Sequence, residues 1–340
     1  MVYPSMNFAP PVGIEPTTYG LEVRRSIQLS YRSNTHLKST GARTTVLPMR
    51  SRHLVVLAAV CFATTGTAQQ LGPDSSSPLG VATIRFFIGS LVLFIIASLR
   101  PSRNPISQHR PLAAWVWIAT AFGQALYGAA FFSAVRSTGV AVGTVVALGS
   151  APLITGVITA ISSRKAPSIS WLGTTVFAII GMSLIVASGK ESQVTMSGVA
   201  LALCAGFGYA IFALGSKTIL SSGVSSELAM AKVFGIASVM LAPTLFFVNL
   251  KWLTHSDAIV MVLWLGIVTL ALAYWSYATG LRHLEPSQTT LITLVEPVVA
   301  TILGVVALSE RPSTVAWLGV LIVIASLLTE SRAPSKNMRH

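Results

Sequence analysis

Ten long apolar runs, separated by short turn-rich connectors, dominate the sequence after residue 49. An α-helix needs about 20 apolar residues to cross the hydrocarbon core of a bilayer. Backbone polar groups find no water there, so each run must be helical. We therefore expect an all-α integral membrane protein with ten transmembrane helices, near residues 54–70, 79–99, 112–135, 140–161, 169–187, 198–214, 228–248, 258–281, 287–308 and 313–329.

The composition excludes an ordinary soluble domain. Of 340 residues, 53% are hydrophobic and 10% are charged, whereas a soluble domain carries about 25% charged residues. The net charge of +13 could suggest nucleic acid, but the basic residues cluster between apolar runs, as the positive-inside rule produces. From residue 50 onward, twelve Lys and Arg lie outside the runs on the side of the N-terminus and four on the other side. This bias predicts cytoplasmic N and C termini and no nucleic-acid partner.

Residues 1–48 differ in kind from the rest, since they are polar, rich in proline and without helical periodicity. The segment GIEPTTYGLEVRRSIQLSYR resembles the conceptual translation of the antisense strand of a transfer RNA gene. We expect this extension to be mis-annotated, with the true start at Met49. The alternative is a disordered native tail.

The remaining sequence repeats itself with a period near 146 residues. Ala134-Val-Arg136 matches Gly280-Leu-Arg282, and Trp171-Leu-Gly173 matches Trp317-Leu-Gly319. Five helices per half is an odd number, so the second half must be inverted in the membrane, which is a transporter architecture. We expect one five-helix repeat over 49–190, a second over 191–332, and a cytoplasmic tail over 333–340.

With these features the chain resembles the drug/metabolite transporter superfamily, in its EamA-type ten-helix branch. The resemblance rests on SPLGVATIRFFIGSLVLF in the second run, FFSAVRSTGVAVGTVVALGSAPL across the third and fourth, LVEPVVATILGVVALSE in the ninth and VAWLGVLIVIAS in the tenth. It covers residues 50–330. The family consists mostly of secondary carriers that export or import small metabolites, amino acids and drugs.

Three ionisable residues lie inside the runs: Arg85, Lys232 and Glu296. Such groups normally face the bundle interior or water. Glu296 is close to the midplane on a face of small residues, so it could bind and release a proton or bind a cationic substrate group. Otherwise it is a structural carboxyl paired with Arg85. Arg85 suits an anionic substrate group, or else an ion pair that holds helices together. Lys232 lies near the cytoplasmic end and could simply extend to the interface.

Two prolines and five polar or aromatic side chains complete the candidate site. Pro152 and Pro297 occupy corresponding places in the two halves, so we expect two symmetric interruptions of the helices, because a proline frees a helix carbonyl to face a cavity. The other candidates could line a substrate path or could be packing residues: Gln124, Tyr127, Tyr274, Trp275 and Tyr277.

The function that these features predict is proton-coupled export of small metabolites, amino acids or drugs by alternating access across a bacterial inner membrane. The expected partners are the bilayer, a small-molecule substrate and protons, and the sequence leaves a homodimer open. No P-loop, metal-ligand spacing or catalytic motif is present, so we expect no cofactor and no enzyme. The alternatives are an organic-anion or sugar-phosphate exchanger of the same superfamily, a membrane-embedded transferase, or a sensor.

Overall fold

The computed structural model describes residues 41–73, 75–99, 111–164, 166–187, 195–309 and 311–332. The chain divides into two compact units, Met1–Met49 and Arg50–His340. In the first unit only the backbone of residues 41–49 is described, and it is helical. The expectations for residues 1–40 and for the tail 333–340 lie outside the described residues and stay predictions.

The described part of the chain contains helices and no strands, as expected for an all-α protein. Seven helical stretches are long and apolar enough to cross a membrane, and two apolar helices are shorter. The count of ten spans stays a prediction. The helices are α2 (Gly41–Gln70), α3 (Pro78–Leu99), α4 (Ala114–Ser163), α5 (Ile169–Ala187), α6 (Met196–Ser221), α7 (Ser226–Leu241), η3 (Ala242–Phe247), η4 (Lys251–Thr254), α8 (Ser256–Gly266), η5 (Ile267–Leu272), α9 (Ala273–Leu281), α10 (Pro286–Ile292), α11 (Val295–Leu308) and α12 (Thr314–Arg332).

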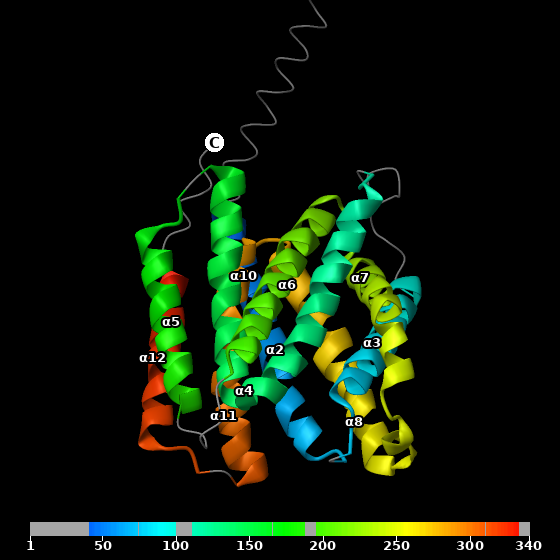
Figure 1. The fold of residues 1–340 in the computed structure, drawn as a ribbon. Coiled ribbons are helices and arrows are strands. Elements are labelled where there is room, and N and C mark those ends of the chain that lie inside the picture. Colours follow the sequence, from blue (N-terminus) through cyan, green and yellow to red (C-terminus); the bar gives the residue numbers. More distant parts are fainter. Residues whose placement is uncertain are drawn as a thin grey trace, which may run out of the picture. The chain divides into compact units, whose positions relative to one another are not determined.

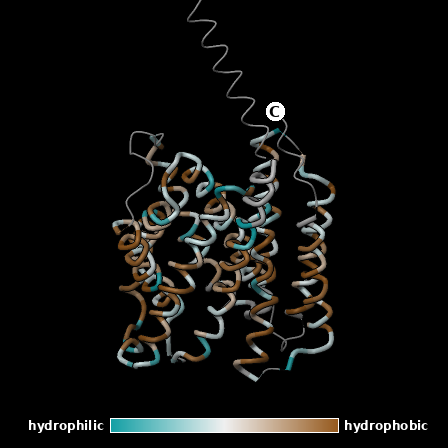
Figure 2. The backbone as a smooth tube through the Cα atoms, turned by 180° about the vertical axis from the view of Figure 1, so that it is seen from behind, coloured by the Kyte–Doolittle hydropathy of each residue, from teal (hydrophilic) through white to brown (hydrophobic). Residues whose placement is uncertain are grey.

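The outer surface of the second unit is apolar. Large hydrophobic side chains are exposed along the helices, among them Phe177, Leu321 and Phe246. Figure 2 shows hydrophobic residues along most of each helix. A soluble monomer rarely exposes so much contiguous apolar surface, so this surface is suited to lipid.

The helix α4 contains two of the expected spans. A straight helix of its 50 residues would be about 75 Å long, more than twice the roughly 30 Å hydrocarbon core. Instead α4 has two arms (Figure 1), and α6 packs against both, with Gly215 opposite Thr120 and Gly206 opposite Ser150.

The connector expected near residues 136–139 of α4 is therefore helical. The hydroxyls of Ser133 and Ser137 each donate to the carbonyl four residues earlier, at 2.8 and 2.9 Å. Such back-bonding bends helices while the backbone stays hydrogen-bonded.

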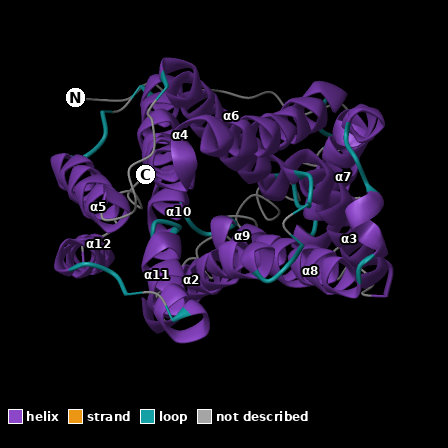
Figure 3. Ribbon diagram, turned by 60° about the horizontal axis from the view of Figure 1, so that its bottom comes forward, coloured by secondary structure: helices purple, strands orange, loops and turns teal. Residues whose placement is uncertain are grey.

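Contacts between helices follow the repeat. The pairs α3–α7 and α5–α12 join equivalent helices, which run in opposite directions (Figure 1). Figure 3 shows these two pairs at opposite ends of the helical unit. Between them, α2 meets α9 where Gly280 faces the Ser51 carbonyl, and α6 meets the first arm of α4 where Gly208 faces the Gly123 carbonyl. In each of these two contacts the first helix of one repeat packs against the third helix of the other, which is the pattern of two inverted repeats.

Candidate functional site

Arg85, on α3, is buried among apolar helices with only 7% of its surface exposed. Its Nε has no hydrogen-bond partner among the described residues. The side chain lies close enough to Glu296 and Tyr274 to interact with both electrostatically. Because a buried charge is costly unless it is paired and hydrogen-bonded, Arg85 keeps a donor available for a further group.

Glu296 lies in the first turn of α11, directly after a break in the helix. The helix α10 ends at Ile292, and Pro297 cannot donate to the Thr293 carbonyl, so the Glu296 N–H does so instead, at 2.9 Å. The Thr293 hydroxyl donates to the Thr290 carbonyl at 2.7 Å. The break therefore satisfies its own carbonyls, and it places a half-buried carboxylate at a helix N-terminus, where the helix dipole favours negative charge.

Pro152 does not break its helix, so the expectation of two symmetric interruptions is wrong there. The helix α4 continues through Pro152. Before this proline, the structure shows the Ser150 hydroxyl donating to the Ala147 carbonyl at 3.2 Å. Three threonines before Pro297 donate to earlier carbonyls, because Thr289 bonds the Glu285 carbonyl and Thr290 the Ser287 carbonyl, in addition to Thr293. The two halves thus differ at this position: both the helix break and the glutamate accompany Pro297 and not Pro152.

Gln124 and Tyr274 connect the two halves of the chain beside Arg85. The Gln124 Nε2 donates to the Tyr274 hydroxyl at 3.1 Å, and both side chains are buried, at 0% and 3% exposure. The Gln124 Oε1 has no hydrogen-bond partner among the described residues. Tyr127, one turn along from Gln124, lies near Glu296 and Tyr274. These four residues and Arg85 form what we call the polar cluster.

Aromatic rings hold the polar cluster in place. The Tyr274 ring centroid lies 4.5 Å from that of Phe234, 4.8 Å from that of Phe62 and 5.5 Å from that of Phe212. Tyr277 is fully buried in the same group, 5.8 Å from Phe212. Ring contacts from α2, α6 and α7 and the Gln124 bond from α4 fix Tyr274, so its hydroxyl is a rigid element of the cluster.

Trp275 and Lys232 lie outside the polar cluster. The Trp275 Nε1 donates to the Glu227 carboxylate at 2.9 Å and so holds α9 against the first turn of α7. Lys232 is exposed, and its Nζ lies 5.3 Å from the centroid of the Trp117 ring. Both side chains contact neighbouring helices, and neither reaches Arg85 or Glu296 through a contact that the structure shows.

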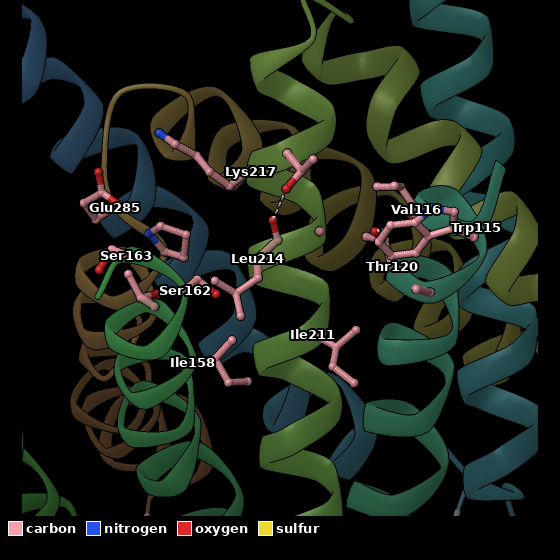
Figure 4. Close-up of a pocket in the computed structure, with 15 residues that line it drawn as sticks. Trp115, Val116, Thr120, Ile158, Ser162, Ser163, Ile211, Leu214, Lys217 and Glu285 are labelled. Atoms are coloured by element: carbon pink, nitrogen blue, oxygen red, sulfur yellow. Dashed lines mark hydrogen bonds between the residues drawn. The ribbon is translucent and has the colours of Figure 1, made fainter. Parts of the chain in front are cut away.

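A cavity of about 730 Å³ opens between α6 and the two arms of α4 (Figure 4). Apolar side chains such as Ile158 and Leu214 form its walls, and Glu285 borders it. Lys217 lines it too, but its Nζ donates to three backbone carbonyls, those of Leu281 (2.9 Å), Arg282 (3.0 Å) and Leu284 (2.7 Å). The ammonium therefore holds the turn between α9 and α10. From the sequence, Lys217 counted only as one of the basic residues at the membrane interface, because a single lysine at the end of an apolar run does not indicate what it contacts.

Comparison with known proteins places the chain in a family. A model of the EamA-like transporter family matches it twice, at residues 52–187 and 196–330. The chain belongs to the EamA-like transporter family. It is therefore a multi-pass membrane protein, and the expected resemblance is confirmed.

Relatives of this EamA-like transporter carry transporter names. The "Uncharacterized transporter YwfM" of Bacillus subtilis is 33% identical over 285 residues, covering 83% of this chain and 94% of that protein. The threonine/homoserine exporter RhtA of Salmonella typhimurium is 26% identical over 296 residues, covering 85% and 95%. A solved crystal structure matches with a TM-score of 0.70 at 17% identity, over 83% of this chain and 96% of that one, and it supports the fold alone.

The polar cluster draws on both EamA repeats. Arg85, Gln124 and Tyr127 come from the first repeat, and Tyr274 and Glu296 come from the second. Transporters with inverted repeats bind substrate near the bilayer midplane, where the two halves meet. Among the described residues no three His, Cys, Asp or Glu side chains gather as a metal site would require. The polar cluster is therefore the candidate substrate site.

Proposed function

We propose that this EamA-like transporter is a proton-coupled exporter of small amino acids. In this proposal it works by alternating access in the bacterial inner membrane, with both termini in the cytoplasm and with the bilayer, the substrate and protons as its partners. The activity of the RhtA relatives, as their name gives it, supports the substrate class. The excess of Lys and Arg on the side of the N-terminus supports the orientation.

The observation that carries the proposal is the pairing of opposite charges in the polar cluster. An amino acid is a zwitterion, with a carboxylate and an ammonium group. The Arg85 guanidinium, with an unpartnered buried donor, suits the carboxylate. The Glu296 carboxylate, which lies close enough to interact with Arg85, suits the ammonium or a proton. One site thus offers each charge of the substrate its complement.

An organic-anion exchanger is less well supported. For such a carrier we expect several free cationic groups at the site, because Arg and Lys side chains bind carboxylate and phosphate groups. Among the described residues, Arg85 is the basic side chain of the polar cluster. The Lys217 ammonium donates to three backbone carbonyls and the Lys232 ammonium lies beside Trp117, so neither adds a cation to the cluster. A transferase or a sensor is not supported either, because the relatives are named as transporters.

Proton coupling is tested with purified protein in liposomes under an imposed pH gradient. The variant Glu296→Gln keeps the shape of the side chain but cannot exchange a proton. We expect the gradient to accelerate threonine transport by the native protein and to lose this effect in the variant, with a fall of at least about tenfold in the driven rate.

The matched control is Asp257→Asn, which removes an exposed carboxylate from the first turn of α8. It should leave both the rate and its response to the gradient unchanged. An undiminished response in Glu296→Gln would remove the coupling role of this residue.

A further inference from the structure

The Gln124 amide has more hydrogen-bonding capacity than its surroundings use. It is fully buried, one end contacts Tyr274, and the other end has no partner among the described residues. Unsatisfied polar groups in a protein interior are costly and call for an explanation. A ligand that is absent from the structure and that bonds the free end of the amide explains this one.

The chemistry of the amide limits what that ligand group can be. The Tyr274 hydroxyl can accept from the amide nitrogen, which leaves the Gln124 oxygen free. If the amide is turned over, the Tyr274 hydroxyl can donate to the Gln124 oxygen, which leaves the Gln124 nitrogen free. A hydroxyl both donates and accepts, so it suits either arrangement, whereas an ammonium only donates and a carboxylate only accepts.

The Gln124 amide belongs to the same cluster as the charges that would hold an amino acid. Tyr274 bonds Gln124 directly and lies near Arg85 and Glu296. Its ring is fixed by Phe62, Phe212 and Phe234. If the α-carboxylate and the α-ammonium bind Arg85 and Glu296, the group left for Gln124 is on the side chain of the substrate.

We infer that Gln124 is a specificity-determining residue that selects amino acids with a hydroxyl on the side chain. The inference rests on the proposed function and deepens it. A site built to bond a hydroxyl discriminates strongly against the isostere without it, because its own polar group then stays unpaired. Threonine and valine have nearly the same shape and differ by a hydroxyl against a methyl group.

The test measures kcat/KM for threonine and for valine with the protein in liposomes. The native protein should favour threonine by at least about tenfold. In Gln124→Leu, which has an apolar side chain of similar size, the ratio should fall toward one, because threonine transport declines while valine transport is kept or improved.

The control is Thr120→Val, which lies one turn earlier on the same helix and is also buried. Among the described residues its hydroxyl bonds the Val116 carbonyl of its own helix, so the native ratio should remain. Valine transport reports whether each variant is folded and inserted.

Different failures have different meanings. A native protein that transports both amino acids at similar rates, or a Gln124→Leu variant that keeps the native ratio, overturns the role of Gln124 and leaves the proposed export intact. A native protein that transports neither amino acid overturns the proposed function and this inference with it.

Discussion

Lys217 illustrates how single residues in this protein are used in ways that their position in the sequence does not reveal. Each of its three ammonium protons bonds a backbone carbonyl at the end of α9 or in the turn that follows. Arg282, in the same turn, bonds the Val224 carbonyl and the Ser226 hydroxyl. Two basic residues counted as interfacial charges thus join the α6–α7 hairpin to the α9–α10 turn.

The variant Lys217→Met should destabilise the protein. It keeps much of the side-chain length but leaves three carbonyls without their donor, a loss of about 1–3 kcal/mol. A thermal melt of the protein in detergent should show a lower apparent Tm. Lys251→Met, which removes an exposed lysine at the start of η4, should melt like the native protein. Equal melting of the two variants would show that the three bonds contribute little.

At this scale the sequence named all five residues of the polar cluster but not the contacts between them. A polar residue inside an apolar run is a reason to suspect function, and this rule found Arg85 and Glu296. The same rule also selected Lys232 and Trp275, which contact neighbouring helices instead. A local pattern does not give the direction of a side chain around its helix. The bond between Gln124 and Tyr274 joins residues 150 positions apart, and no short-range pattern reveals it.

At the scale of helices, interruptions and close contacts position the site. The break between α10 and α11 turns Glu296 into the first turn of a new helix. The π-helical segment η5 inserts a wider turn directly before Tyr274, and such segments often occur at functional sites. Neither irregularity has a dependable sequence signal: Pro152 and Pro297 correspond in the repeat, yet only Pro297 accompanies a break.

Close packing of α5 against α12 gives the prediction at this scale. A Cβ added at Gly181 would lie 2.8 Å from the Gly319 carbonyl oxygen and 2.9 Å from the Val323 nitrogen. Since backbone atoms cannot move aside cheaply, Gly181→Ala should force the two helices apart and cost about 1–3 kcal/mol. The apparent Tm of the purified protein measures this loss.

The same substitution about two turns earlier on α5 provides the control. Gly173, also on α5, has open space around its missing Cβ. Gly173→Ala should leave the Tm unchanged or raise it, because alanine favours a helix by up to about 1 kcal/mol over glycine. A Gly181→Ala protein as stable as Gly173→Ala would mean that the α5–α12 contact is not tight.

The sequence predicted the architecture of the whole molecule better than it predicted any single site. The ten apolar runs lie mostly on helices, because the requirement for hydrogen-bonded backbone in lipid leaves little choice of structure. The internal repeat predicted two equivalent halves, and in the structure the pairs α3–α7 and α5–α12 join equivalent helices. What the runs could not predict is how α4 folds back, since the connector near Ser137 stays helical and gives no turn signal.

The central claim concerns the molecule as a whole: its two halves meet around a polar cluster that binds the substrate. The most direct test is the binding of radiolabelled threonine to the purified protein in detergent. The native protein should bind saturably. Arg85→Met should weaken binding by at least about tenfold, because the carboxylate loses a charge-assisted hydrogen bond. Arg85→Lys should be intermediate, because it keeps the charge but loses the planar donor geometry. Native affinity in Arg85→Met, with Lys251→Met as the folded reference, would contradict the account.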